Sequence, residues 1–369
     1  MRPFDFHPRS RVIFGAGTLS RIGERAHALG ITRVLIVADR GIAAVGYVDA
    51  ARRALEGAGI AVETFHEFTE NPDTDMVEAG RAHAAALGVN GIVGLGGGSS
   101  MDCAKGINFL LTNGGAMADY RGYGKASRPM LPMIGVPTTA GTGSDAQSYA
   151  LISDARTHVK MACGDAKAAF STVILDPELT TSQPAHVTSA AGYDAIAHAV
   201  ETWVTRTRNP MSDLFAREAW RLLEGSFERV LRAPRDLDAR GAMLVGSHLA
   251  GAAIEQSMLG ATHACANPLT ARYGTTHGVA IALLLRHVVQ WNSSSEETRA
   301  RYVALAPDLP ARLEALAHIG QFPAGLAAAG VSEDDLDMLA HEAAAQRTGT
   351  FNPRPFDEHG AREIYEMAW

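Results

Sequence analysis

The chain has 369 residues, of which 47% are hydrophobic and 20% charged, values of an ordinary globular protein. This length suggests two domains or one large α/β unit. The net charge of −7 and the lack of a Lys/Arg block argue against nucleic acid as a partner. No stretch of about 18 apolar residues would span a bilayer, and the N-terminus has no apolar signal region. The three cysteines are far apart and fit no disulfide framework, so we expect a cytoplasmic protein with no membrane partner.

Short β runs alternate with helical patterns over the first 180 or so residues. The predicted strands are, in chain order, residues 11–15, 33–38, 61–65, 91–95 and 132–136. The helical patterns between them include residues 19–29, 48–57 and 74–87. This alternation indicates a mostly parallel sheet covered by helices.

The amino-acid composition changes near Pro184. From there on the chain is rich in Ala, Leu, Glu and Arg, with long helical periods and few β-branched runs. We therefore predict an α/β nucleotide-binding domain over residues 1–182 and an all-α domain over residues 183–369. With no long linker between them, the cleft between the two domains is the expected ligand site.

The best candidate for a phosphate-binding loop is Gly96-Gly-Gly-Ser-Ser100, which follows a predicted strand and opens a helix. Glycines let a pyrophosphate approach the backbone, and a helix N-terminus offers free N–H groups. The alternative is a tight turn with Ser99 as the helix cap, but three consecutive glycines exceed what a cap needs. The segment Gly15-Ala-Gly17 is a weaker candidate for a phosphate loop, because it lacks the third glycine of the dinucleotide fingerprint. We interpret it as a simple turn.

Two further features belong to the same predicted edge of the sheet. The segment Pro137-Thr-Thr-Ala-Gly-Thr-Gly-Ser-Asp145 offers hydroxyls that can bind ribose and phosphate, although a polar turn has the same composition. Asp39 ends a predicted strand, where an acid can accept a hydrogen bond from a ribose hydroxyl and repel a 2′-phosphate. A solvated turn residue is the alternative. Because Asp39 precedes the loop at Gly96, the nucleotide site must be organised differently from the usual fingerprint.

Four residues of the second half form a candidate metal site. Asp194 and His198 are four apart, so they share one face of a helix, and Asp194 stands in an otherwise apolar run. With His263 and His277 they make one carboxylate and three imidazoles, a complete set of ligands for a divalent transition metal acting as a Lewis acid. The chain has 14 histidines, so packed or surface histidines at chance spacings are the alternative. We interpret Cys265 as a packing residue.

Taken together, these motifs resemble the iron-containing (group III) alcohol dehydrogenase family, in the superfamily that also holds glycerol dehydrogenase and dehydroquinate synthase. The resemblance covers nearly the whole chain. The matching segments are Phe14-Gly-Ala-Gly, Asp39, Asn71-Pro72, Gly96 to Lys105, Pro137 to Ser144, Leu175-Asp-Pro, Gly192 to Glu201, His263, Pro268, His277-Gly-Val and Asn352-Pro-Arg354.

The resemblance implies the dehydroquinate synthase-like fold and an NAD-dependent dehydrogenase acting on a small alcohol or aldehyde, with a homodimer expected. It implies that Asp194, His198, His263 and His277 hold Fe²⁺, or Zn²⁺ in some members. The implied nucleotide contacts are Asp39, Asn71, Gly97, Gly98, Ser99, Asp102, Thr138, Thr139, Thr142, Lys160 and Leu179. We assign catalytic roles to His277 and Asn267.

The chain departs from the family pattern in three places. Asn267 stands where many members have a second histidine near the nicotinamide, and Asn can hydrogen-bond but cannot titrate. Ser144-Asp145 replaces Ser-Glu, and the C-terminal domain is shorter than is common. Two alternatives therefore stay open: a dehydroquinate-synthase-like lyase that uses NAD transiently, and a non-catalytic NAD- or metal-binding homologue.

Overall fold

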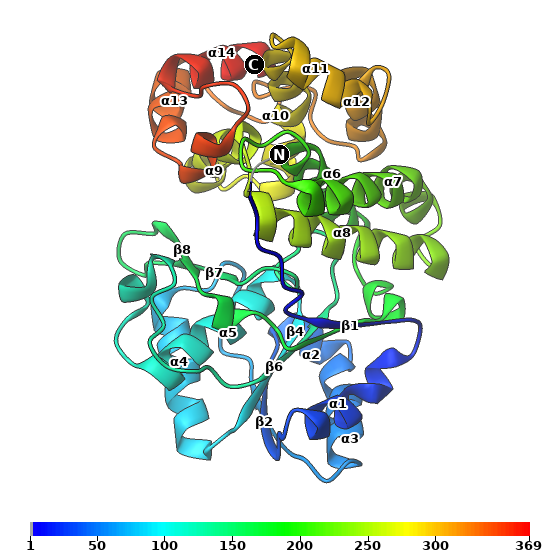
Figure 1. Cartoon of the computed structure of the whole chain (residues 1–369), viewed down its shortest axis with the longest axis vertical. Helices are drawn as coiled ribbons and strands as arrows, with labels where there is room; N and C mark the ends of the chain where they lie inside the picture. Colours follow the sequence, from blue (N-terminus) through cyan, green and yellow to red (C-terminus); the bar gives the residue numbers. More distant parts are fainter. Residues whose placement is uncertain (1–2) are drawn as a thin grey trace. The chain divides into compact units, whose positions relative to one another are not determined.

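The computed structural model describes residues 3–369, which divide into two compact units. One unit is His7–Gln183. The other is Pro184–Trp369 together with residues 3–6. Figure 1 shows the helices and strands of each unit.

A six-stranded parallel sheet forms the centre of the first unit. The alternating pattern predicts a parallel sheet and five of these strands, but not the strand Thr172–Leu175. The strand order of the sheet is β1-β9-β6-β4-β2-β3, and every pairing in it is parallel. The strands are β1 (Arg11–Phe14), β2 (Arg33–Val37), β3 (Ala61–Phe65), β4 (Gly91–Gly96), β6 (Met133–Pro137) and β9 (Thr172–Leu175). The strand order reverses between β2 and β4, and in open α/β sheets ligands bind outside the carboxyl ends of the strands at such a point.

Helices cover both faces of this sheet, because the side chains of each strand alternate between the two faces. Val34 and Ile36 of β2 pack in one apolar cluster with residues of α1 and α3. The opposite face is covered by α4 and α5 (Figure 1). The helices of this unit are α1 (Ile22–Ala28), α2 (Arg40–Ala44), α3 (Tyr47–Glu56), α4 (Thr74–Leu87) and α5 (Gly98–Asn113). The three helices expected from the sequence correspond to α1, α3 and α4.

A second, three-stranded sheet in this unit has no counterpart among the predicted elements. Its order is β5-β8-β7, with β8 parallel to β5 and antiparallel to β7. The strands are β5 (Gly122–Tyr123), β7 (Tyr149–Ser153) and β8 (Lys160–Gly164). β5 has only two residues, and the segments of β7 and β8 mix polar and apolar residues without a clear alternation, so they do not stand out as strands.

The second unit is built from helices, and its described residues include no strand. The helices are α6 (Ala185–Thr202), α7 (Pro210–Arg232), α8 (Leu237–Ser257), α9 (Ala261–Tyr273), α10 (His277–Asn292), α11 (Glu296–Val303), α12 (Leu309–Ile319), α13 (Leu336–Ala344) and α14 (Glu358–Ala368). Their boundaries follow capping chemistry. Asn209 accepts hydrogen bonds from the backbone at the start of α7, where Pro210 takes the first helical position, and Asp236 caps α8.

Helix α6 is the central element of this unit. It packs against α7, α8 and α10 (Figure 1). Its residues from Thr188 to Thr202 are buried, apart from Ala191. A helix buried on all sides should be apolar throughout, so each polar residue on it needs a partner.

Among residues 3–369, no helix is both long enough and apolar enough to traverse a lipid bilayer.

Candidate active site

Three polar residues lie along one face of α6. Asp194 and His198 are four residues apart and Glu201 follows three residues later, so the helical repeat stacks them on the same side. All three are buried, with exposed fractions of 4 to 5%. Burying this much polar surface is unfavourable unless the groups bind one another or a ligand.

The starts of α9 and α10 bring two more imidazoles to this face. The Nε2 atoms of His198 and His263 each lie 3.4 Å from Asp194 Oδ1, and His277 Nε2 lies 3.8 Å from the same oxygen. The rings of His198 and His263 are stacked with centroids 4.8 Å apart, and the His277 ring is 5.4 Å from that of His263. All four residues predicted as metal ligands therefore meet around one carboxylate oxygen.

The chemistry of this cluster fits a divalent cation. Within the described residues, Asp194 Oδ1 and His263 Nε2 are buried and make no hydrogen bond. The ligating atoms of Asp194, His263 and His277 all lie within 4.8 Å of one another. Two ligands each about 2.1 Å from a four-coordinate ion lie about 3.4 Å apart, which is the spacing of the nearest pairs here. One carboxylate and three imidazole nitrogens suit Fe²⁺ or Zn²⁺.

The electrostatics of the cluster agree with this interpretation. Burial alone would raise the pKa of Asp194, but the surrounding imidazoles outweigh burial and hold it well below its usual range. Burial lowers the pKa of His263, whereas the carboxylates of Glu201 and Asp194 raise it; the balance brings it to about 9. The neighbouring imidazoles thus favour the ionised form of Asp194, and the carboxylates favour positive charge on the ring of His263.

The candidate phosphate loop follows β4 and opens α5. The N-cap of α5 is Gly97 and no side chain caps this helix, so the structure does not use Ser99 as a cap. The N–H groups of the first turn of a long helix attract anions. A Cβ added at Gly98 would lie 2.8 Å from Thr142 Cγ2, and one added at Gly97 would lie 3.3 Å from Thr139 Cγ2. Glycine here lets the Thr-rich loop lie directly against the phosphate loop.

Asp39 lies beside this loop. A Cβ built on Gly96 would be 3.5 Å from Asp39 Oδ2, so the ends of β2 and β4 place the carboxylate and the glycines together. Asp39 also caps α2, because its Oδ1 accepts from Ile42 N at 3.0 Å. Thr138 is 3% exposed, and its hydroxyl has no hydrogen-bond partner in the described part of the chain. Glycines, hydroxyls and this carboxylate at one sheet edge suit a dinucleotide.

Asp102 belongs to a buried network behind the phosphate loop. Ser144 Oγ donates to Asp102 Oδ1 at 2.6 Å, and Lys105 Nζ lies 4.0 Å from the same oxygen. Lys105 is fully buried and donates to the carbonyl oxygens of Ser144 and Tyr149 at 2.6 and 2.7 Å. Burial raises the pKa of Asp102, and the lysine and hydroxyl partly offset this effect. The network ties α5 to the end of the Thr-rich loop.

The other predicted nucleotide contacts divide into two groups. Asn71 has a left-handed backbone with φ of 55°; its N–H donates to Ser99 Oγ at 3.2 Å and its Oδ1 accepts from Lys160 Nζ at 3.0 Å. These three residues lie together at the phosphate loop. Leu179, in the short 3-10 helix Pro177–Thr180, is buried in the apolar cluster under β2.

Asn267 lies one helical turn after His263 on α9. Its Nδ2 donates to Gln346 Oε1 at 3.1 Å, which fixes the orientation of its side-chain amide. Glu201, which receives hydrogen bonds from the first turn of α9, is the residue of this region that the residue-level prediction misses. Its signal in the sequence is a single acid seven residues after Asp194 in an apolar helix.

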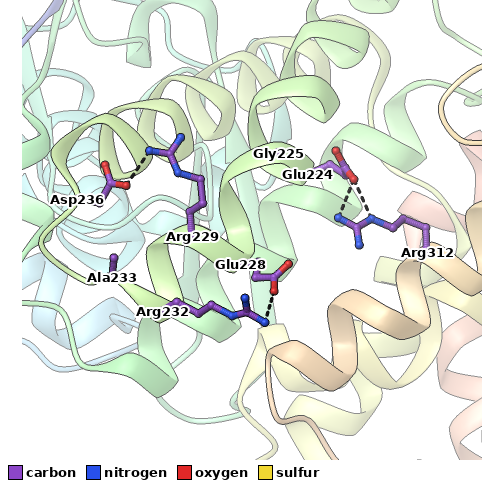
Figure 2. A pocket seen from close by; sticks show the side chains of 8 residues that line it. All are labelled: Glu224, Gly225, Glu228, Arg229, Arg232, Ala233, Asp236 and Arg312. Atoms are coloured by element: carbon purple, nitrogen blue, oxygen red, sulfur yellow. Dashed lines mark hydrogen bonds and ion pairs between the residues drawn. The ribbon is translucent and has the colours of Figure 1, made fainter.

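A depression in the surface near α7 lies apart from this chemistry. Figure 2 shows that its charged side chains are paired with one another. The pairs are Arg312 with Glu224, Arg232 with Glu228 and Arg229 with Asp236, at 2.5 to 2.7 Å. Within the described residues that line it, these acidic and basic groups are therefore paired with one another.

Both halves of the chain match models of known families. Residues 8–177 match the model "Iron-containing alcohol dehydrogenase", and residues 188–369 match "Fe-containing alcohol dehydrogenase family, C-terminal". Alcohol dehydrogenase 4 of Schizosaccharomyces pombe is 35% identical over 98% of this chain and 88% of its own length. The NAD-dependent methanol dehydrogenase of Bacillus methanolicus is 31% identical over 95% of each chain. A crystal structure of a 1,3-propanediol oxidoreductase superimposes with a TM-score of 0.96 at 33% identity, covering 100% of both chains. With its fold, its histidine cluster and both of its halves in agreement, the chain belongs to the iron-containing alcohol dehydrogenase family.

Proposed function

We propose that this protein is a metal-dependent, NAD(H)-linked alcohol dehydrogenase that interconverts a small alcohol and the corresponding aldehyde or ketone. The observation that carries the proposal is the convergence of three imidazole nitrogens within 3.4 to 3.8 Å of Asp194 Oδ1. Family membership and the NAD-dependent relative support the choice of reaction and cofactor. We propose the residues up to 182 as the nucleotide domain and residues 183–369 as the metal and substrate domain, with residues 3–6 grouping with the helical unit.

Asp194, His198, His263 and His277 would hold Fe²⁺, with Zn²⁺ as the alternative. A cation held there would supply Lewis-acid stabilisation to the oxygen of an alcohol or carbonyl group. His277 is the most exposed of the four, with about a third of its side chain accessible, so the substrate side of the site is next to this residue. The buried Asp194 contributes the negative charge that makes the site selective for cations.

The nucleotide contacts are proposed on the geometry of the sheet edge. Gly97, Gly98 and Ser99 offer backbone N–H groups to the pyrophosphate. Asp39 accepts from a ribose hydroxyl and disfavours NADP. The hydroxyls of the Thr-rich loop (Thr138, Thr139 and Thr142) and the side chains of Asn71, Asp102, Lys160 and Leu179 complete the set.

The proposed role of Asn267 is to bind and orient a substrate hydroxyl or a water molecule, because its amide group cannot titrate. Its Nδ2 is engaged by Gln346, so its Oδ1 faces a different direction and can accept from a substrate hydroxyl or a water molecule. An amide cannot serve as a base, so the alcohol proton leaves by another route.

Two finer statements complete the proposal. A cytoplasmic location is supported by three buried cysteines that form no disulfide. A homodimer is proposed from the family resemblance, and light scattering on the purified protein tests it.

The test of the reaction is NADH oxidation by purified protein with a panel of short aldehydes. Chelation should abolish activity, and readdition of Fe²⁺ or Zn²⁺ should restore it. Binding of metal and NADH without turnover of any aldehyde would instead support a non-catalytic homologue.

A further inference from the structure

Glu201 is a buried carboxylate that the proposed ligand set does not use. It lies on α6 on the same face as Asp194 and His198, and it is 4% exposed. A carboxylate at that depth is stable only if strong donors surround both of its oxygens. The identity of those donors connects it to the metal site.

The two oxygens of Glu201 bind two different parts of α9. Oε1 accepts a hydrogen bond from the backbone N–H of Thr262 at 2.7 Å, in the first turn of the helix, where N–H groups lack helical partners. Oε2 is in short contact with Nδ1 of the His263 ring. One side chain therefore holds both the backbone next to the ligand and the ligand's own ring.

The contact at Nδ1 determines which nitrogen of His263 is available to a metal. An ionised carboxylate only accepts hydrogen bonds, so Nδ1 must carry the proton. The lone pair of the neutral ring then lies on Nε2, the atom 3.4 Å from Asp194 Oδ1 and without a hydrogen bond within the described residues. Carboxylates that receive the second N–H of a ligating histidine recur in metalloproteins.

The residues around Glu201 leave room for its contacts with the start of α9. A Cβ on Gly260, just before α9, would lie 3.1 Å from Glu201 Oε1 and 3.0 Å from Asn352 Oδ1. Asn352 accepts from Ala261 N at 3.2 Å and exchanges two hydrogen bonds with Asn292. Glycine at residue 260 lets both side chains reach the helix start. Asn352 supports the backbone only, whereas Glu201 also reaches the ring.

We propose that Glu201 is a positioning residue that fixes the tautomer and orientation of His263 for metal binding. The inference rests on the proposed metal site and adds to it a residue that touches neither metal nor substrate. It also adds a second negative charge near the cation, so that Asp194 and Glu201 together balance a divalent ion.

The decisive variant is Glu201→Gln, which preserves size and removes one acceptor. If the amide oxygen stays on the Thr262 N–H, the NH₂ group faces Nδ1 and forces the ring proton onto Nε2. Metal-free protein is titrated with Zn²⁺ in competition with a chromophoric chelator. We expect Zn²⁺ to bind the variant about 10- to 100-fold more weakly than wild type.

A double-mutant cycle separates positioning from general support. In a His263→Ala background, Glu201→Gln should change the Zn²⁺ dissociation constant by less than about twofold, because the imidazole ring that Glu201 contacts is absent. Asn352→Ala, which loosens the same helix start without touching the ring, should lower the melting temperature and leave Zn²⁺ affinity near wild type. Glu363→Gln is the matched control, since that carboxylate accepts from Trp291 Nε1 at 2.6 Å in the same unit.

The outcomes distinguish this inference from the proposed function. Wild-type protein that fails to bind Zn²⁺ would overturn the metal site itself. Normal wild-type binding together with an unchanged Glu201→Gln, or with Asn352→Ala equally impaired, would overturn only the role of Glu201. If Glu201→Gln does not fold, ¹⁵N NMR of the His263 ring in zinc-loaded wild type decides: we expect a protonated Nδ1 and a metal-bound Nε2, and the reverse would refute the inference.

Discussion

Gly278 of α10 lies so close to Ala190 of α6 that a Cβ atom on it would be 2.1 Å from the Ala190 carbonyl oxygen. The obstacle is backbone, which cannot rotate away. This approach of α10 to α6 brings His277, the first residue of α10, to within 3.8 Å of Asp194 Oδ1. The geometry of the ligand cluster therefore depends on a glycine that binds nothing.

The first prediction concerns this glycine. Gly278→Ala should lower the free energy of unfolding by about 1–3 kcal/mol, because overpacking displaces α10. It should also weaken Zn²⁺ binding by about tenfold or more, since His277 moves with the helix. Urea unfolding of metal-free protein and chelator competition measure the two effects. Gly225→Ala in α7, where an added Cβ meets nothing within 4 Å, is the control and should stabilise by up to about 1 kcal/mol. If Gly278→Ala binds Zn²⁺ as tightly as wild type, the geometry of the ligand cluster does not depend on this glycine.

The second prediction concerns the choice of cofactor. Asp39→Ser retains a helix cap for α2 but removes the charge that would repel a 2′-phosphate. We expect the ratio of kcat/KM for NADPH over NADH to rise about tenfold or more, equivalent to about 1.4 kcal/mol. Asp39→Ala, which removes both cap and charge, should show the same change in preference with an added loss of stability. An unaltered ratio in both variants would place the 2′-hydroxyl elsewhere.

The third prediction concerns Asn267. Asn267→His should retain activity and add a titration between about pH 6 and 7 to the profile of kcat/KM, because histidine can exchange a proton and asparagine cannot. Gln346→Ala, which removes the partner of the Asn267 amide, should change the rate without adding a titration. Superimposable profiles for wild type and Asn267→His would show that no proton passes this position.

The fourth prediction concerns stability and pH. His287 on α10 is buried and receives a hydrogen bond on Nε2 from Arg286 at 3.0 Å. Burial, followed by the positive charge of Arg286, lowers its pKa to about 4, although Glu314 acts in the opposite direction. Between about pH 4 and 6.5 the unfolded state binds more protons than the folded state, so the free energy of unfolding should fall as pH falls through this window.

His287→Gln isolates that contribution. Between pH 7 and pH 5, metal-free wild type should lose about 1–2 kcal/mol more stability than the variant in urea unfolding. Equal losses in the two proteins would mean that His287 is solvated or protonated in the folded state.

The sequence predicts the parts of this protein that depend on local pattern. Five of the six parallel strands are short, mostly apolar or alternating runs, and Asp194 and His198 are four apart on one helix, so these features are visible without a structure; the strand Thr172–Leu175 is missed. The arrival of His263 and His277 at Asp194 depends on α9 and α10 packing against α6. The residues alone leave two alternatives, a metal site or histidines at chance spacings, and the resemblance to the family favours the metal site.

The features missed by the sequence depend on contacts between distant segments. Glu201 has a partner only after α9 begins at Gly260, and the acid alone does not identify that partner. In the small sheet, β5 has only two residues, and β7 and β8 lack the apolar runs that mark the strands of the larger sheet. The position of Asp39 beside Gly96 of the candidate phosphate loop depends on the pairing of β2 with β4.

In the reaction that we propose, one carboxylate and three imidazoles hold the metal on which turnover depends. The most direct test is the metal content of protein reloaded after chelation, measured alongside NADH oxidation with a short aldehyde, for wild type and Asp194→Ala. We predict about one Fe²⁺ or Zn²⁺ per wild-type chain with activity restored in proportion, and neither metal nor activity in the variant. Full activity in metal-free wild type, or stoichiometric metal in Asp194→Ala, would contradict the account.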